Sequence, residues 1–415
     1  MENLQGFYNE LTDTLHHNIL AFWLNRMEDH ERGGFYGQMK GDGTLVKDAP
    51  RGAILYARIL WTFSAAYRTT LRTEYFEAAR RMRDYILRYF VDREYGGTFW
   101  EVDCEGRPSD THKQFYAQAF MIYGLSEFVR AADIYVQKND CPCSDIQREV
   151  DEAYAEAMSL YQIIERYSRE PLYGGYIEAC SRQWGTMEDM RLSELDENFP
   201  KSQNTHLHIL EAYTNLLRVA RPSDVESIKP NLKALIELFL DHILNPETHR
   251  LILFFQMDWT LGGHRKESYG HDIEFSWLLH ESAMVLNDKA LLTRVEKIVP
   301  LIAQGARKGI LPDGSMIHEQ DLDSDVHDSQ RHWWVQAEMV VGYYRLYRYF
   351  GDKEALPLAL SGWNYIRKNL IDNTMGEWHW SCGDDGCPDL SQDHAGFWKC
   401  PYHNTRMCLE VLYDD

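Results

Sequence analysis

Apolar residues recur at helical spacing along most of the chain, in segments that come in pairs. Residues 53–69 are apolar on nearly every face, whereas residues 74–89 confine their apolar side chains to one stripe. Apolar residues at i, i+3, i+4 and i+7 are typical of helices. The same alternation recurs in four further pairs, at 116–129 and 149–166, 205–218 and 224–243, 273–286 and 290–305, and 334–349 and 354–370. We predict an inner helix from the more evenly apolar member of each pair and an outer helix from the other.

Short glycine-containing segments with aromatic neighbours lie between the predicted helix pairs. The clearest are GGFY at 33–36, GGTFW at 96–100 and GGYI at 174–177, with weaker echoes at 251–254, 314–317 and 376–380. Successive segments are 62 to 78 residues apart, so six units account for nearly the whole chain. A recurring period of this kind indicates a repeat architecture. We expect these segments to form short strands in loops at one end of the molecule.

Six helical hairpins closed into a ring make an all-α (α/α)6 barrel, which is the fold that this repeat predicts. An open helical solenoid has the same local pattern, but its terminal repeats carry a polar outer face. Neither end of this chain shows an obvious capping repeat, which favours closure. Because no Pro/Ser-rich linker or low-complexity tract interrupts the repeats, we expect one catalytic domain over residues 1–415. The acidic run DLDSDVHD at 321–328 reads most simply as a solvated loop.

Charge and segment composition narrow the set of partners. The chain has 43 basic and 64 acidic residues, a net charge of −21. This balance argues against nucleic acid or an anionic membrane, since both reward clustered Lys and Arg. It also favours a neutral substrate over a polyanionic one. The first residues lack the pattern of a secretory signal, and no apolar stretch reaches the roughly 18–20 residues that span a bilayer. We therefore expect a cytoplasmic protein with no membrane contact.

The eight cysteines do not form a familiar framework. Cys141-Pro-Cys143 and the pair Cys382 and Cys387 differ from the C-x2-C spacing of common zinc sites. Free thiols in a reducing compartment are the simpler interpretation. A structural zinc site is the alternative.

Three histidine motifs open predicted inner helices. They are NTHLH at 204–208, SYGHDIE at 268–274 and WKCPYHN at 398–404. The N-terminal ends of helices in a ring converge on one mouth, and the residue just before the first inner helix lies at the same level. We therefore expect four side chains to gather there: His208, His271, His403 and Arg51. Each alone could be a helix cap, but four matching placements favour a shared site.

Two of these histidines precede a glutamate by three residues, His208 before Glu211 and His271 before Glu274. This spacing puts both side chains on one helical face, where a carboxylate can fix the tautomer and basicity of the imidazole. His206 and His208 lie two apart, so their rings diverge by about 200° and do not form a metal-binding pair. No H-E-x-x-H, G-x-S-x-G or Walker motif appears. We expect acid/base histidines without a cofactor or a catalytic metal.

Several of the 12 Trp and 25 Tyr fall at the level of the predicted mouth. Trp277 lies two turns beyond His271, and Trp333-Trp334 opens the fifth inner helix one turn before Glu338. Three more tryptophans flank the last segment: Trp378, Trp380 and Trp398. Core packing explains some of them. Indoles and carboxylates beside histidines are typical of a site for a neutral polyhydroxylated ligand, because flat rings stack on the C–H faces of sugars.

As a set, these motifs resemble the N-acylglucosamine 2-epimerase superfamily, and within it the cellobiose 2-epimerases. The match is carried by Arg51 with RILWTFSA at 58–65, by the three histidine motifs, and by RHWWVQAE at 331–338. It extends from about residue 5 to the C-terminus. The resemblance implies a cofactor-independent 2-epimerisation. The reducing-end glucose of a β-1,4-linked disaccharide, such as cellobiose or lactose, would become mannose through ring opening and a cis-enediolate.

The resemblance also implies roles for individual residues. His403 and His271 would be the acid/base groups on opposite faces of C2, His208 would assist ring opening or hold the O1/O5 region, and Arg51 would stabilise the enediolate. Eight residues would bind the sugar: Tyr116, Asp196, Asn204, Glu274, Trp277, Trp334, Glu338 and Trp398.

The chemistry agrees with histidines in these roles. A C2 proton is acidic only in the open-chain aldehyde, so the ring must open first. An imidazole with a pKa near 6.5 suits proton removal at neutral pH, and a guanidinium beside the developing oxyanion lowers the barrier. Reprotonation from the opposite face calls for a second histidine.

Alternatives stay open at this stage. Transfer on a single face would give an aldose–ketose isomerase, and a monosaccharide or N-acylglucosamine 2-epimerase would use the same residues. The same ring also hosts inverting glycoside hydrolases, which need two carboxylates roughly 6.5–9.5 Å apart. A non-catalytic sugar-binding protein would need the tryptophans but not Arg51 with three histidines. We expect a disaccharide as the small-molecule partner and a monomer or weak homodimer.

Overall fold

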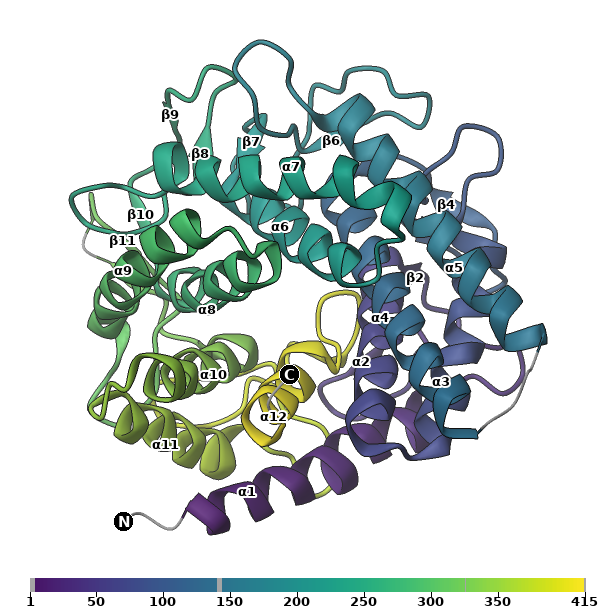
Figure 1. Ribbon diagram of the computed structural model, residues 1–415. Helices are drawn as coiled ribbons and strands as arrows, with labels where there is room; N and C mark the ends of the chain where they lie inside the picture. The colour runs from purple at the N-terminus through teal and green to yellow at the C-terminus, as the bar shows by residue number, and fades with distance from the viewer. Residues whose placement is uncertain (1–3, 140–143, 325, 414–415) are drawn as a thin grey trace.

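The computed structural model describes residues 4–139, 144–324 and 326–413, and its inner helices form a closed ring (Figure 1). Each inner helix packs against the next, and the last packs against the first, so the predicted (α/α)6 barrel is confirmed over an open solenoid. The inner helices in chain order are α2 (Ala53–Thr70), α4 (Phe115–Asn139), α6 (Gln203–Arg218), α8 (Tyr269–Leu286), α10 (Trp333–Phe350) and α12 (Tyr402–Leu412).

An outer helix covers each inner one, and the sixth comes from the start of the chain. Helix α1 packs against α12, so the last hairpin joins the two ends of the sequence. The amphipathic pattern did not single out α1. The outer helices are α1 (Leu4–Asp13), α3 (Thr73–Tyr85), α5 (Ser144–Ile163), α7 (Pro222–Leu238), α9 (Lys289–Ala306) and α11 (Ala355–Tyr365).

The outer helices continue into short π-helical or 3-10 turns. The π-helical turns are η1 (Thr14–Leu20), η2 (Trp23–Met27), η3 (Ile86–Phe90), η4 (Ile164–Ser168), η5 (Phe239–Ile243) and η7 (Ile366–Leu370), and η6 (Arg307–Gly309) is a 3-10 turn. Each π turn buries its first and last residues, for example Ile86 and Phe90. These turns carry four of the outer helices to about the ends that the apolar pattern predicts.

Short antiparallel strands lie in the loops that lead into the inner helices. They pair as β1 (Met39–Lys40) with β14 (Asp393–Ala395), β2 (Arg51–Gly52) with β3 (Glu101–Val102) and β4 (Pro108–Asp110), β5 (Lys113–Gln114) with β6 (Ala179–Cys180), β7 (Lys201–Ser202) with β8 (Phe254–Phe255) and β9 (Leu261–Gly262), β10 (Lys266–Ser268) with β11 (Glu319–Asp321), and β12 (Arg331–His332) with β13 (Ser381–Cys382). Five of them directly precede an inner helix, so the strand-bearing end of the ring is the N-terminal end of these helices.

Apart from Phe254, which begins β8, the glycine–aromatic segments are not themselves strands, which corrects that prediction. Each forms a single bridge back to the end of the preceding outer helix, as between Phe35 and Glu28. The true strands follow a few residues later. The double glycines have a local cause, because Gly33 and Gly34 adopt φ of 78° and 70°, a left-handed conformation that other residues resist.

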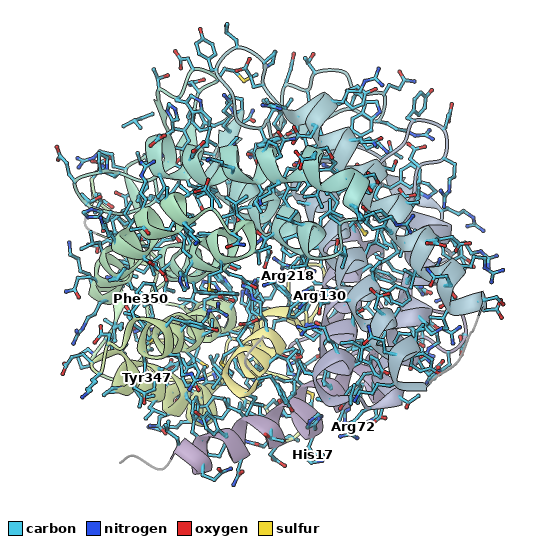
Figure 2. All side chains as sticks on the ribbon, viewed as in Figure 1. His17, Arg72, Arg130, Arg218, Tyr347 and Phe350 are labelled. Atoms are coloured by element: carbon cyan, nitrogen blue, oxygen red, sulfur yellow. The ribbon has the colours of Figure 1, made fainter. Side chains whose placement is uncertain are left out.

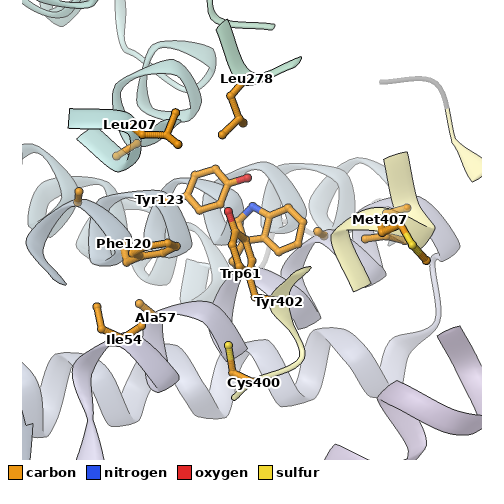
Figure 3. Close-up of a cluster of buried hydrophobic side chains, with 14 of the residues drawn as sticks. Ile54, Ala57, Trp61, Phe120, Tyr123, Leu207, Leu278, Cys400, Tyr402 and Met407 are labelled. Atoms are coloured by element: carbon orange, nitrogen blue, oxygen red, sulfur yellow. The ribbon is translucent and has the colours of Figure 1, made fainter. Parts of the chain in front are cut away.

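Aromatic side chains of α2, α4 and α12 pack together in the core (Figure 3). Trp61 stacks on Tyr123 with ring centroids 5.4 Å apart and meets the edge of Tyr402 at 5.2 Å. Phe120 meets Tyr402 edge-on at 5.5 Å. Two of these aromatics also contact polar groups of the strand-bearing end, since Tyr402 donates to Glu211 and Phe120 packs on His208.

At the end of the ring away from the strands, ion pairs join neighbouring inner helices. Arg68 of α2 and Arg130 of α4 both contact Glu127, at 2.6 and 3.0 Å, and Arg218 of α6 contacts Glu281 of α8 at 2.6 Å. Arg130 and Arg218 point toward the middle of the ring (Figure 2). Cationic side chains near helix C-termini also interact favourably with the helix dipoles.

Two composition-based expectations bear on the described residues. Six cysteines there are free thiols, while Cys141 and Cys143 lie outside the described residues. Within the described part of the chain, no helix combines the length and apolar character needed to cross a bilayer.

Candidate active site

The strand-bearing end of the ring brings His208, His271 and His403 into one neighbourhood. They stand in the first two turns of α6, α8 and α12. Trp334 of α10 lies between two of them, with its ring 4.9 Å from that of His271 and 5.6 Å from that of His403. Burial, followed by repulsion from His318, His208 and His403, holds the pKa of His271 well below its usual value.

His403 is fixed by a buried carboxylate. Its Nδ1 lies 2.7 Å from Glu338 Oε1. An ionised carboxylate only accepts hydrogen bonds, so Nδ1 carries the proton and the lone pair is on Nε2. Burial lowers the pKa of His403 to about 3 although Glu338 opposes that shift, so the ring is neutral at neutral pH.

His208, like His403, has its Nδ1 bonded to a buried carboxylate. Its Nδ1 lies 2.9 Å from Glu211 Oε2, and its ring packs against Tyr116 and Phe120 at 4.8 and 4.6 Å. The i, i+3 spacing of His208 and Glu211 therefore has the effect expected from the sequence. Burial again lowers the imidazole pKa.

A buried guanidinium, Arg406, joins the carboxylates behind these histidines. Its Nη2 donates to Glu274 Oε1 at 2.6 Å and to Glu338 Oε1 at 2.7 Å, and its Nη1 donates to Glu211. Tyr402 also donates to Glu211. We call Glu211, Glu274, Glu338 and Arg406 the Arg406 cluster. Through Glu338 and Glu211, this cluster connects His403 and His208 to the same guanidinium, that of Arg406.

Three carboxylates and one guanidinium leave the Arg406 cluster short of positive charge. Burial and then repulsion from Glu338 raise the pKa of Glu274 to about 8. Burial also pushes the pKa of Glu338 upward, but the charge of Arg406 and the His403 hydrogen bond outweigh it and hold that pKa below normal. At neutral pH, Glu274 therefore carries a proton while Glu338 is ionised.

Trp277 supports this cluster and does not face the mouth, contrary to its predicted role as a sugar-binding residue. Its Nε1 donates to Glu338 Oε2 at 3.0 Å, and its ring lies under Arg406 at 4.7 Å. The side chain is buried.

His271 has a different partner from the one predicted. Its Nδ1 lies 2.7 Å from Ser268 Oγ, whereas Glu274, three residues on, binds Arg406. The shared helical face permits a His271–Glu274 contact, but in the structure Glu274 accepts from Arg406 and His271 is bonded to Ser268. Beyond His271 lies His318, with ring centroids 5.9 Å apart.

The structure places Arg58, and not Arg51, beside the histidines. Arg51 donates to Asp29 at 2.6 Å and to the Gly33 carbonyl at 2.7 Å, and its side chain is 1% exposed. It holds the first loop in place. Two turns further along α2, Arg58 donates to the Tyr116 hydroxyl at 2.9 Å and lies over the Phe120 ring at 4.3 Å.

The charge of Arg58 is felt at the histidines. After burial, it is among the groups that lower the pKa of His208 and of His403. A guanidinium in this position is suited to stabilise negative charge on a sugar bound between the two rings.

A pocket with about 610 Å³ of empty space opens beside His271. Two predicted binding residues line it, Asn204 and Asp196. Asp196 accepts from Ser193 Oγ at 2.7 Å, and Asn204 Oδ1 is buried without a hydrogen-bond partner. The other predicted aromatic residue, Trp398, lies 6.1 Å from Tyr116, on the side of the site nearer to Arg58.

Acidic and histidine ligand atoms converge at this end, which raises the question of a metal. Glu274, Glu338 and His403 each offer an atom within 4.8 Å of the others. Arg406 donates to both carboxylates, and Glu338 already accepts from His403. The cation that this donor set binds is therefore the guanidinium.

Sequence reasoning missed Arg406, Arg58 as a site residue, and His318. Arg58 had a signal, because it is the one charged residue in the apolar run 53–67. Arg406 follows His403 by three residues, on the same face of a buried helix. His318 had none, since it lies in a loop just before β11. Asp328, taken as part of a solvated loop, in fact contacts His332 at 2.8 Å.

Comparisons with known proteins agree with this geometry. The family model for N-acylglucosamine 2-epimerase (GlcNAc 2-epimerase) matches residues 34–405. A cellobiose 2-epimerase of Bacteroides fragilis is 48% identical over 97% of this chain and 98% of its own. One from Ruminococcus albus is 37% identical over 97% and 96%.

A solved structure gives the same result. That of cellobiose 2-epimerase from Bacillus thermoamylovorans superposes with a TM-score of 0.88 at 37% identity, covering 98% of this chain and 99% of the other. The resemblance drawn from the motifs is thereby confirmed.

Proposed function

This chain belongs to the N-acylglucosamine 2-epimerase family, and from that premise we propose that it epimerises disaccharides at C2 of the reducing-end glucose. The substrates would be β-1,4-linked, such as cellobiose and lactose, and the products their mannose-ended epimers. The near full-length similarity to cellobiose 2-epimerases supports a carbohydrate epimerase of this type. No cofactor enters the proposed reaction.

The observation that carries the proposal is the fixed tautomer of His403. With Nδ1 bound to Glu338, the Nε2 lone pair is left to act as a base, and burial keeps it unprotonated at neutral pH. His208 has the same arrangement through Glu211, which suits it to move a proton at O1 or O5 while the ring opens.

In the open-chain aldehyde, one imidazole removes the proton from C2. The C–H electron pair forms a C1–C2 double bond, and the carbonyl pair moves onto O1 to give a cis-enediolate. Arg58 would stabilise that negative charge. The second imidazole, in its protonated form, returns a proton to C2 from the opposite face, and the carbonyl re-forms. We assign the two imidazoles to His403 and His271.

The carboxylates favour this chemistry over glycoside hydrolysis. An inverting hydrolase separates its acid and base so that water fits between them. Here Glu211, Glu274 and Glu338 all converge on one guanidinium. Glu211 and Glu338 orient histidines, and the three carboxylates do not face one another across a gap.

The remaining predicted residues fit substrate binding. Tyr116, Trp334 and Trp398 border the histidines, and Asn204 and Asp196 line the adjoining pocket, which would take the second sugar unit. Flat indole rings and a buried amide oxygen are groups that bind sugar C–H faces and hydroxyls.

The test is an incubation of the protein with cellobiose in D2O containing EDTA, followed by NMR of the reducing-end signals. We expect the mannose-ended epimer with deuterium at C2. Deuterated product from glucose, mannose or N-acetylglucosamine alone would instead indicate a monosaccharide epimerase. Ketose would indicate an isomerase, and released glucose a hydrolase.

A further inference from the structure

A two-base epimerisation leaves the enzyme in the opposite protonation state after every turnover. One imidazole has gained the proton from C2, and the other has given its own away. Before the same sugar epimer can react again, one proton must leave the first imidazole and one must reach the second. This requirement rests on the proposed function. It means that the site needs a route by which protons exchange with solvent.

The side of His403 offers no exit. Its Nδ1 is bonded to Glu338, and Glu338 is bonded in turn to Arg406 and Trp277. Glu274, Glu338 and Arg406 are all buried. Among the described residues, this network closes on itself and presents no group to bulk water.

The side of His271 leads outward through His318. Each of the two histidines has a ring nitrogen within 4.8 Å of the other. One water molecule bridges such a gap, because two hydrogen bonds of about 2.8 Å meeting near the tetrahedral angle span it. Trp334 packs on both rings, at 4.9 Å from His271 and 5.1 Å from His318, and so holds them in this relation.

Beyond His318, two carboxylates reach the solvent. His318 Nδ1 lies 3.8 Å from Asp328 Oδ2, and its Nε2 lies 3.4 Å from Glu319 Oε1. The side chain of His318 is 20% exposed, that of Glu319 28% and that of Asp328 31%. Asp328 is held in place by His332 at 2.8 Å. The path from His271 thus runs from a half-buried ring at the site to groups in contact with water.

We propose that His318 carries protons between His271 and solvent, and that this transfer resets the enzyme between turnovers. A proton leaving His271 Nε2 passes through one water to a His318 nitrogen. His318 then releases a proton from its other nitrogen toward Asp328 or Glu319. The reverse sequence loads His271, and a proton held on His403 Nε2 after product release reaches the same exit through water in the emptied site. No bond other than N–H and O–H bonds forms or breaks.

The proposal makes a kinetic prediction that a structural role would not. Resetting happens after product release, so it limits kcat at saturating substrate and does not enter kcat/KM. In His318→Asn, we expect kcat for cellobiose in dilute buffer to fall at least tenfold while kcat/KM changes less than twofold. Imidazole buffer should restore kcat in a saturable way, because a small base can replace the missing side chain.

The matched control is His327→Asn, which removes an exposed histidine from the same loop. Its kcat should equal that of the wild type and should not respond to buffer. A His318→Asn enzyme with unchanged kcat, or with kcat and kcat/KM reduced together and no buffer response, overturns the relay. A wild type without turnover overturns the proposed function as well, so the two failures are distinguishable.

Discussion

The two proposed acid/base histidines lie in unlike surroundings, although both stand in the first turn of an inner helix. His403 is bonded to Glu338 within the Arg406 cluster, where every group is buried. His271 is bonded to a serine hydroxyl and faces His318 and the pocket. The His403 side of the site is hydrogen-bonded to the buried Arg406 cluster, whereas the His271 side opens toward substrate and solvent.

This difference separates two tasks that a single imidazole cannot perform equally well. A buried ring with a fixed tautomer is a well-oriented base, because its lone pair has only one direction. A ring beside an open pocket can exchange protons. The comparison predicts that substitutions on the His403 side change basicity and orientation, whereas those on the His271 side change proton exchange.

The largest expected effect is from removing either imidazole. His403→Ala and His271→Ala should each reduce epimer formation by about 10²–10⁴-fold, the range of general acid–base catalysis. NMR of cellobiose reactions measures the loss, and circular dichroism checks the fold. Substantial activity in either single variant would contradict the assignment of one histidine to each face.

The next effect distinguishes two arginines that are seven residues apart. Arg58→Met should lower kcat/KM by about 10²–10³-fold, because it removes a cation from the developing enediolate. Arg51→Met should instead cost about 3–5 kcal/mol of stability by leaving buried Asp29 unpaired, with little change in kcat of the folded enzyme. Steady-state kinetics and thermal unfolding of both variants measure this, and the reversed pattern would restore Arg51 to the catalytic role.

A smaller effect concerns pH. The pKa of Glu274 is raised to about 8, so this group is neutral below that pH and ionised above it. Ionisation adds negative charge beside the enediolate, so kcat/KM should fall as pH rises through about 8. Because burial lowers the pKa of His403 to about 3, protonation of this base should cause no loss near pH 6.

The neutral variant Glu274→Gln tests this assignment. It should lack the alkaline fall, so that at pH 9 its kcat/KM relative to neutral pH exceeds that of the wild type by about tenfold. An unchanged alkaline limb in the variant would mean that another group titrates there.

The smallest effect lies at the far end of the ring. Arg218→Met breaks the ion pair with Glu281 between α6 and α8. Since Arg218 is partly exposed, we expect about 0.2–1 kcal/mol of lost stability and no change in kcat. Chemical denaturation measures the first, and a changed kcat would show that the two ends of the ring are coupled.

The ring and its histidines could be predicted from the sequence because both follow from spacing along single helices. Apolar periodicity gives the helix pairs, and a motif at each helix start gives His208, His271 and His403. The predictions that failed concern contacts between different helices, which spacing along one helix does not determine. Arg58 and Arg51 lie two turns apart on one segment, and only the packing of α4 and α12 shows which of them reaches the site.

The partner of His271 illustrates the same limit. Its spacing to Glu274 equals that of His208 to Glu211, yet only the second pair forms. Arg406, from another helix, binds both glutamates, but His208 keeps the second oxygen of Glu211 whereas His271 is bonded to Ser268. Helix α1 escaped prediction similarly, since its hairpin partner is at the other end of the chain.

Half-reactions in D2O test whether His403 and His271 serve opposite faces of C2. Each single alanine variant is incubated separately with cellobiose and with its mannose-ended epimer, and exchange of the C2 proton is followed by NMR. We expect each variant to exchange the C2 proton of one epimer but not of the other. The two variants should differ in which epimer exchanges. Exchange of both epimers by one variant would contradict it.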